Sequence, residues 1–128
     1  MDQNILIVDD SATMRAVVKR TLGMAGISTR ACLEAHNGSK ALEILAANPI
    51  DLVLADLHMP VMGGVEMTRR MLADERLRSI PVIVISAEPS DQRLAELKSQ
   101  GVRGCIRKPF TPESLRSVIQ ETVGVSHE

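Results

Sequence analysis

Residues 51–60, DLVLADLHMP, decide the fold class of this 128-residue chain. The four apolar residues at 52–55 run without interruption, as is typical of a parallel strand covered on both faces. The next residue, Asp56, is a carboxylate with no obvious partner beside it. Removing a lone charge from water is costly unless another group compensates for it. The sequence therefore raises the question of which groups compensate Asp56 at the end of this strand.

Apolar runs of strand length recur along the chain. The runs at 5–8 and 82–85 are as continuous as the run at 52–55, whereas those at 28–35 and 104–107 are weaker. Strand and helix alternate five times, so we expect an α/β fold with a doubly wound parallel sheet and helices on both faces. The helical patterns, whose expected apolar faces include Val17 and Leu72, lie within residues 14–25, 41–46, 65–72, 94–97 and 115–123.

Residues that stop or start helices stand at the ends of these patterns. Gly26 follows the first pattern and Gly101 follows the fourth, and glycine is a common helix stop. Thr111 is placed to cap the fifth helix, with Pro112 at its first helical position. These signals support the division of the chain into strands and helices.

The length and composition predict one folded domain. A chain of this size fits a single domain, which we expect to span 1–128, with a core at about 3–124 and a frayed tail at 125–128. Apolar residues make up 45% of the chain, enough for a packed core, and Phe110 is its only aromatic residue. The net charge of -1 gives no argument for nucleic acid or a membrane as a partner, and we expect neither.

Cysteine usage and the N-terminus predict a soluble cytoplasmic protein. Cys32 and Cys105 lack CxxC spacing, which suits a reducing compartment. The three histidines lack the spacing of zinc ligands. The first residues do not form a signal peptide, and no segment reaches the roughly 20 apolar residues of a membrane span.

Acidic residues also follow the first strand. Asp9 and Asp10 come directly after residues 5–8, as Asp56 comes after 52–55. In open parallel sheets, ligands bind outside the carboxyl ends of the strands, where the strand order reverses. If the first and third strands are neighbours, the three carboxylates converge and repel one another. A hard divalent cation relieves this repulsion, and ligands that are all oxygen indicate Mg²⁺.

Two more polar residues end strands at the same expected edge. Ser86 follows the fourth strand and Lys108 follows the fifth. Alone, Ser86 is a common turn residue, Lys108 a common solvated residue, and an Asp pair a common helix start. Together, a cation, a hydroxyl, a carboxylate and an ammonium group are the groups needed to handle a phosphoryl group. We therefore expect phosphoryl chemistry at this edge.

The chain resembles response-regulator receiver domains, most closely the stand-alone chemotaxis type. The matching motifs cover essentially the whole chain: LIVDDSATMR at 6–15, LVLADLHMPVMGG at 52–64, VIVISAEP at 82–89 and IRKPF at 106–110. The resemblance implies a flavodoxin-like sheet of five parallel strands in the order 2-1-3-4-5 with five helices. That order would place Cys32 and Cys105 on opposite edges, too far apart for a disulfide.

The resemblance implies a role for each acid of the cluster. Asp56 would accept the phosphoryl group, and Asp10 and Asp56 would bind Mg²⁺ directly. Asp9 would bind Mg²⁺ through water. The backbone carbonyl of His58 would be a further ligand of the ion.

The same resemblance implies the rest of the phosphoryl site and the partners. Ser86 would donate a hydrogen bond to the phosphoryl group and Lys108 would pair with it, with a cis peptide bond between Lys108 and Pro109. A histidine kinase would supply the phosphoryl group, and the chain itself would catalyse the transfer and the later hydrolysis. A downstream target protein would bind the face made by the fourth helix, fifth strand and fifth helix.

Four positions bear on how such a domain would be tuned. Cys105 stands where receiver domains usually carry an aromatic switch residue, so the switch is expected to differ here. His58 stands where asparagine or a similar polar residue is frequent, and Ser86 where threonine is commoner. Glu88, two residues beyond Ser86, occupies a position that can tune the lifetime of the phosphoryl group.

Two other functions compete with this interpretation. Hydrolases of the haloacid dehalogenase type also use a strand-end aspartate, but they need an acid two residues later, where this chain has His58. A binding module that works without phosphorylation is favoured only by Cys105, while the intact acids, hydroxyl and lysine argue against it. Magnesium-dependent labelling by acetyl phosphate would separate these functions.

Overall fold

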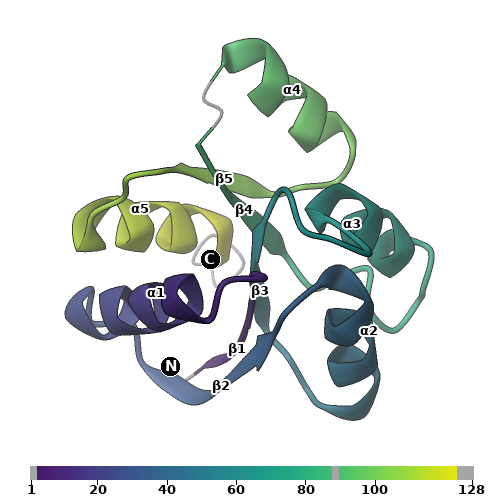
Figure 1. Cartoon of the computed structure of the whole chain (residues 1–128), viewed down its shortest axis with the longest axis horizontal. Helices are drawn as coiled ribbons and strands as arrows, with labels where there is room; N and C mark the ends of the chain where they lie inside the picture. The colour runs from purple at the N-terminus through teal and green to yellow at the C-terminus, as the bar shows by residue number, and fades with distance from the viewer. Residues whose placement is uncertain (1–2, 88–89, 124–128) are drawn as a thin grey trace.

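The five apolar runs form one parallel sheet with the order β2-β1-β3-β4-β5 (Figure 1). The computed structural model describes residues 3–87 and 90–123. The expected flavodoxin-like order is therefore confirmed, and Cys32 and Cys105 lie on the two outermost strands. The strands are β1 (Gln3–Val8), β2 (Thr29–Ala35), β3 (Leu52–Asp56), β4 (Val82–Ser86) and β5 (Gly104–Arg107).

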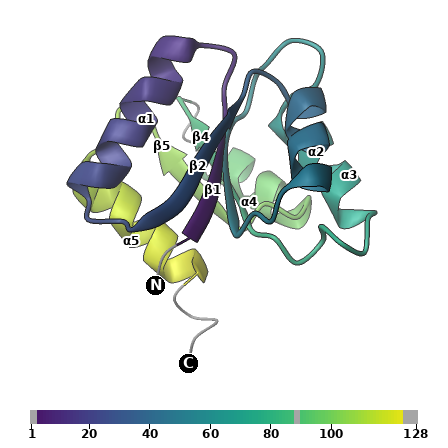
Figure 2. The same cartoon turned by 90° about the horizontal axis from the view of Figure 1, so that it is seen from below.

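Five helices cover the two faces of the sheet. Helices α1 and α5 lie on one face, and α2, α3 and α4 lie on the other (Figures 1 and 2). In the described part of the chain, no helix is long and apolar enough to cross a membrane. The helices are α1 (Ala12–Met24), α2 (Gly38–Ala47), α3 (Gly64–Leu72), α4 (Asp91–Ser99) and α5 (Pro112–Val123).

Each central strand contains a continuous apolar run of four residues because both faces of the sheet are buried there. Successive side chains of a strand point to opposite faces, so each continuous run supplies two cores. A shift of one residue in register would exchange the two sets, which differ in size, and the packing therefore holds the register. The core under α1 and α5 contains Ile5, Ile7, Leu52, Leu54, Ile83 and Ile85, whereas the opposite core contains Leu6, Val8, Val53, Ala55, Val82 and Val84.

Two strands extend one residue beyond the apolar runs that predicted them. β3 ends on Asp56 rather than on residue 55, and β4 ends on Ser86 rather than on residue 85. Asp56 and Ser86 are both paired with residues of the neighbouring strand, so the sheet fixes the backbone at each of them.

The prediction is wrong for two residues that were expected on the apolar faces of helices, because both are exposed. Val17 is 42% exposed and Leu72 is 44% exposed. Adjacent helix positions differ by about 100° around the axis, so Val17 turns away from the face on which Val18 and Leu22 are buried. Leu72 is adjacent to buried Met71 and turns outward for the same reason.

The helix ends follow the local signals. Gly26 and Gly101 both have positive φ, 74° and 102°, which suits glycine at the end of a helix. Pro112 begins α5. The Thr111 hydroxyl accepts a hydrogen bond from the Ser114 backbone N–H at 3.0 Å, and the Ser114 hydroxyl accepts one from the Thr111 N–H at 2.9 Å. The predicted cap is confirmed, with Ser114 as its reciprocal partner.

The loop after β3 contains a strained turn. The Met62 backbone N–H donates to the Pro60 carbonyl at 2.7 Å, and Val61 between them has a φ of 69°. A β-branched residue at positive φ is rare because its side chain crowds the backbone. The Met62 carbonyl accepts a hydrogen bond from the Gly38 N–H at 2.8 Å, which ties the turn to the start of α2. Val61 itself is 84% exposed and gains little from burial.

We expect Val61→Asn to raise the free energy of unfolding by about 1 kcal/mol, because asparagine tolerates positive φ far better than valine. Urea unfolding of the two proteins measures the difference. Val17→Asn is the matched control: Val17 is a partly exposed valine in a helix, where valine and asparagine have similar propensity, so little change is expected. Equal changes for the two substitutions would contradict strain at Val61.

Candidate functional site

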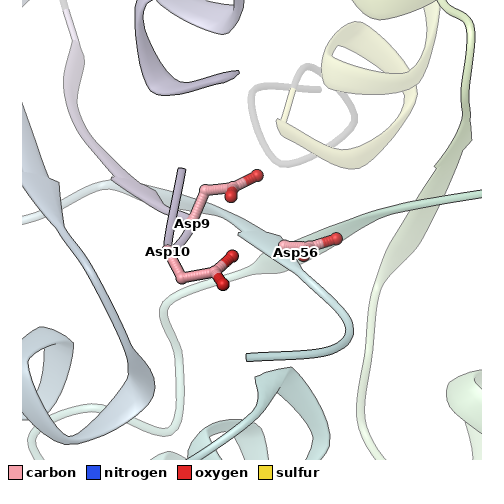
Figure 3. A group of neighbouring side chains, drawn as sticks. All are labelled: Asp9, Asp10 and Asp56. Carbon is pink, nitrogen blue, oxygen red and sulfur yellow. The ribbon is translucent and has the colours of Figure 1, made fainter. Parts of the chain in front are cut away.

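Three carboxylates meet at the carboxyl ends of β1 and β3. The two strands are neighbours, and their register pairs Val8 with Ala55, so the acids that follow these residues emerge at one level. One carboxylate oxygen from each of Asp9, Asp10 and Asp56 lies within 4.8 Å of the others (Figure 3). The convergence expected from the sequence is confirmed.

The three acids differ in exposure. Asp9 is buried, with 6% of its surface exposed, whereas Asp56 is partly buried and Asp10 is exposed. Burial raises the pKa of the Asp9 carboxyl, and the nearby charge of Asp56 raises it further. The Ser11 backbone N–H, which donates to Asp9 Oδ1 at 2.9 Å, works in the opposite direction. The negative charge at Asp9 is therefore only partly compensated by the protein.

Lys108 provides a cation next to Asp56. Its Nζ lies 3.3 Å from Asp56 Oδ1, and both side chains are largely covered. The Lys108 backbone N–H donates to the Ser86 carbonyl at 2.8 Å, which anchors the lysine beside the end of β4. The Lys108–Pro109 peptide bond is cis, as expected. Lys108 is thus one of the groups that compensate Asp56.

The other predicted site residues lie in different parts of the fold. Ser86 is buried at the end of β4, on the same edge of the sheet, because Asp56 pairs with Ile85 in the ladder. His58 is exposed in the loop that follows β3. Cys105 pairs with Val84 inside the β4–β5 ladder and so lies away from the strand ends. Glu88 lies outside the described residues.

A pair of glycines brings α3 against the backbone of Asp56. A side chain at Gly64 would place its Cβ 2.8 Å from the Asp56 carbonyl oxygen, and one at Gly63 would lie 2.9 Å from the Leu57 carbonyl oxygen. The Gly64 N–H donates to that Leu57 carbonyl at 3.1 Å. Sequence reasoning assigned these glycines no role. Two glycines in a row at the start of a helical pattern were the signal that the backbones approach closely.

A second missed residue is Arg15. Its Nη1 donates to the Asp9 carbonyl oxygen at 2.6 Å, and its Nε donates to Glu34 at 2.8 Å. It lies one helical turn beyond Ser11, whose hydroxyl caps α1 by accepting from the Met14 N–H. Its place at the end of the motif LIVDDSATMR was the only signal in the sequence.

The donor set fits a hard divalent cation. All three side chains offer carboxylate oxygens, which Mg²⁺ prefers, and their separations let one ion reach them directly or through water. An ion here would also offset the negative charge of Asp56, which adds to the effect of burial in raising the pKa of Asp9. With Lys108 beside Asp56, the site can stabilise negative charge on a group attached to that carboxylate.

Comparison with known proteins identifies similar chains. The response regulator receiver domain family matches residues 5–120. The chemotaxis protein CheY of Pseudomonas aeruginosa is 38% identical over 117 residues, 91% of this chain and 93% of that protein. The structure of the chemotaxis response regulator CheY4 of Vibrio cholerae has a TM-score of 0.84 at 30% identity and covers 95% of this chain and 99% of that one.

A further solved structure holds a metal ion. It is the receiver domain of the sensor histidine kinase PA1611 from Pseudomonas aeruginosa, with magnesium coordinated in its active-site cleft. Its TM-score is 0.82 at 25% identity, and the match covers 97% of this chain and 99% of that one.

We expect Asp9→Asn to unfold at higher urea concentration than the wild type at pH 7 without divalent cations. A raised pKa means that the folded state favours the protonated carboxyl. The stability that the protonated Asp9 carboxyl contributes is complete below the ordinary pKa of 3.8. This contribution is lost as the pH rises through the raised pKa. Asparagine cannot ionise, so it avoids this loss while its Oδ1 still accepts from Ser11.

The advantage of Asp9→Asn should shrink as the pH falls towards 3.8, and urea unfolding at a series of pH values in EDTA measures it. Asp51→Asn is the control, because Asp51 is an exposed carboxylate that accepts a hydrogen bond from the Asn4 backbone N–H. It should give no such gain at pH 7. An Asp9→Asn advantage that does not depend on pH would contradict the ionic origin.

Proposed function

Because the chain belongs to the response regulator receiver domain family, we propose that it accepts a phosphoryl group on Asp56 from a histidine kinase in two-component signalling. The observation that carries this proposal is the position of Asp56 at the carboxyl end of β3, the central strand of the sheet. Two further carboxylates lie within 4.8 Å and the Lys108 ammonium lies 3.3 Å away. A carboxylate at this place has a cation beside it and an approach from solvent.

The three acids are proposed to hold Mg²⁺. Asp10 and Asp56 would bind the ion directly, Asp9 would bind it through water, and the His58 backbone carbonyl would complete the protein ligands. The bound ion would offset the negative charge of the phosphoryl group and of its acceptor. The magnesium in the PA1611 receiver domain supports this assignment, as does the all-oxygen donor set of this chain.

The transfer proposed here exchanges one bond to phosphorus for another. An Asp56 carboxylate oxygen attacks the phosphorus atom, an O–P bond forms, and the N–P bond to the donor histidine breaks. Lys108, already beside Asp56, pairs with the transferred oxygens, and the Ser86 hydroxyl donates a hydrogen bond to them. Attack by water on the same phosphorus would later break the Asp56 O–P bond.

The lifetime of the phosphorylated state is proposed to depend on residues at the rim. His58 is exposed two residues beyond Asp56, which would place its ring near the path of the attacking water. Glu88 is assigned a similar tuning role by its place in the sequence. The chain would then act as a signalling phosphoacceptor that turns over its own phosphoryl group, rather than as an enzyme with a separate substrate.

The output surface is proposed to be the face made by α4, β5 and α5, where a target protein would bind. A cavity of about 260 Å³ lies there, with Lys98, Arg103 and Cys105 among the residues that line it. Burial raises the pKa of the Cys105 thiol, which favours its neutral form. A small neutral side chain cannot sweep out the volume of an aromatic ring, so the switch would differ from the aromatic version.

The proposal also covers the extent of the domain, its location and its class of partner. The chain would be a single cytoplasmic receiver domain over 1–128 with its core at about 3–124, and the tail expected at 125–128 lies outside the described residues. We propose protein partners, and the net charge of -1 gives no argument for binding to nucleic acid or to a membrane.

We expect acetyl phosphate and Mg²⁺ to add one phosphoryl group to the wild-type chain, and Asp56→Asn to abolish the labelling. Intact-mass measurement detects the adduct, and reductive trapping followed by peptide mapping locates it. Asp51→Asn, which alters an exposed acid at the opposite end of β3, should label normally. Undiminished labelling of Asp56→Asn would refute the assignment, and an unlabelled wild type would favour a phosphorylation-independent binding module.

We expect His58→Asn to alter the dephosphorylation rate while labelling at Asp56 is retained, because the ring lies at the rim and only its backbone would serve the metal. Decay of the labelled protein after removal of acetyl phosphate measures the rate. His36→Asn is the control, since His36 is also exposed but follows the edge strand β2. Superimposable decay of His58→Asn and wild type would mean that the imidazole takes no part.

A further inference from the structure

The guanidinium of Arg15 joins three elements behind the acidic cluster. Arg15 is the fourth residue of α1, and its side chain is 17% exposed. Its Nη1 donates to the Asp9 carbonyl oxygen, just past β1, at 2.6 Å, and its Nε donates to Glu34 of β2 at 2.8 Å. A planar guanidinium presents donors in fixed directions, so the two contacts together hold its orientation.

These contacts hold the peptide between the two acids. The Asp9 backbone N–H donates to the Ala35 carbonyl of β2 at 3.0 Å, so the chain is fixed on the side that precedes Asp9. On the side that follows Asp9, the carbonyl oxygen is held by Arg15. This carbonyl belongs to the peptide that leads into Asp10, and the orientation of that peptide sets where the Asp10 side chain starts. Asp10 is exposed, so packing alone does little to direct it.

Glu34 limits the electrostatic effect of the arginine on the cluster. Its carboxylate pairs with Arg15 and lies 3.9 Å from Lys19 of the same helix. The positive charge of Arg15 is therefore compensated by a carboxylate that is not one of the three acids of the cluster. Such a group can fix a backbone carbonyl without competing with a cation at the site.

We propose that Arg15 is a positioning residue for the metal site: it orients the Asp9–Asp10 peptide so that both carboxylates face a common divalent cation, and Glu34 orients Arg15. The proposal rests on the proposed function, because that function assigns the cation to the three acids. In this proposal Arg15 itself would contact neither the ion nor the phosphoryl group.

The sign of one measurement separates positioning from simple electrostatics. Arg15→Gln removes a positive charge near an anionic site, which by charge alone should tighten the binding of a divalent cation. Loss of positioning should weaken it instead. Substitution of groups that orient metal ligands commonly reduces metal affinity 10- to 100-fold, and we expect about a tenfold loss here.

The experiment is a titration of the whole chain with MgCl₂, in which calorimetry and amide chemical shifts measure the binding. Arg15→Gln and Arg15→Lys should both bind Mg²⁺ about tenfold more weakly than the wild type, because one ammonium cannot reproduce two donors held in a fixed plane. The amide signal of Asp10 should move in both variants before any Mg²⁺ is added. Lys19→Gln is the matched control: it removes a cation that contacts Glu34 but not Asp9, and its affinity should not fall.

Each outcome decides the proposal. Arg15→Gln that binds Mg²⁺ as tightly as the wild type, or more tightly, would overturn it, as would an equal loss in Lys19→Gln. If Arg15→Gln does not fold, Arg15→Lys carries the test, because lysine keeps the charge but has only one donor nitrogen in place of the two that Arg15 uses. Failure of the wild type to bind Mg²⁺ would overturn the proposed metal site itself, which is a different result from a wild type that binds and variants that match it.

Discussion

Parallel pairing of β1 with β3 is the constraint on which the rest of this structure depends. Their register pairs Val8 with Ala55, so the acids that follow lie at the same level. Three carboxylates thereby come within 4.8 Å of one another. Like charges at this separation repel, and partial burial strengthens the repulsion. The fold accepts this cost because both strands are held by apolar packing on two faces, which no local repulsion at their ends can dislodge.

Several groups around the cluster compensate the repulsion or hold the acids in place. Lys108 lies 3.3 Å from Asp56 because its own backbone is bonded to Ser86, at the end of the next strand. The start of α3 abuts the Asp56 carbonyl, where only glycine fits at position 64. Compensation stays incomplete, since burial and neighbouring charge still raise the pKa of Asp9. A protein whose acidic site lacks a cation is less stable because the charges stay uncompensated. Functional sites commonly lower the stability of the folded state in this way.

The proposed input and output regions differ in how they are built. The acidic cluster is held by backbone hydrogen bonds, by Arg15 and by close approach of α3, all of which favour a rigid site. The face of α4, β5 and α5 instead contains a cavity lined by Cys105 and by side chains of both helices. Lys108 joins the two regions, because it follows β5 and its ammonium lies beside Asp56, and Ser86 lies at the end of the neighbouring strand β4. A phosphoryl group that engages both residues would act on the strands that carry the output face.

The sequence alone determined the elements and their chemistry, because the signals involved are local. Apolar runs marked the strands, Gly26 and Pro112 marked helix ends, and an acid at a strand end marked Asp56 as a candidate site residue. Apolar patterning could not determine strand order, since burial is non-directional and the runs at 5–8 and 52–55 could pair with any other strand; the order came from family resemblance. Only the tertiary structure decided that Asp9 is buried while its neighbour Asp10 is exposed, and that Arg15 reaches back to hold the peptide between them. Exposure and such contacts depend on which elements meet in space, and spacing along the chain does not record that.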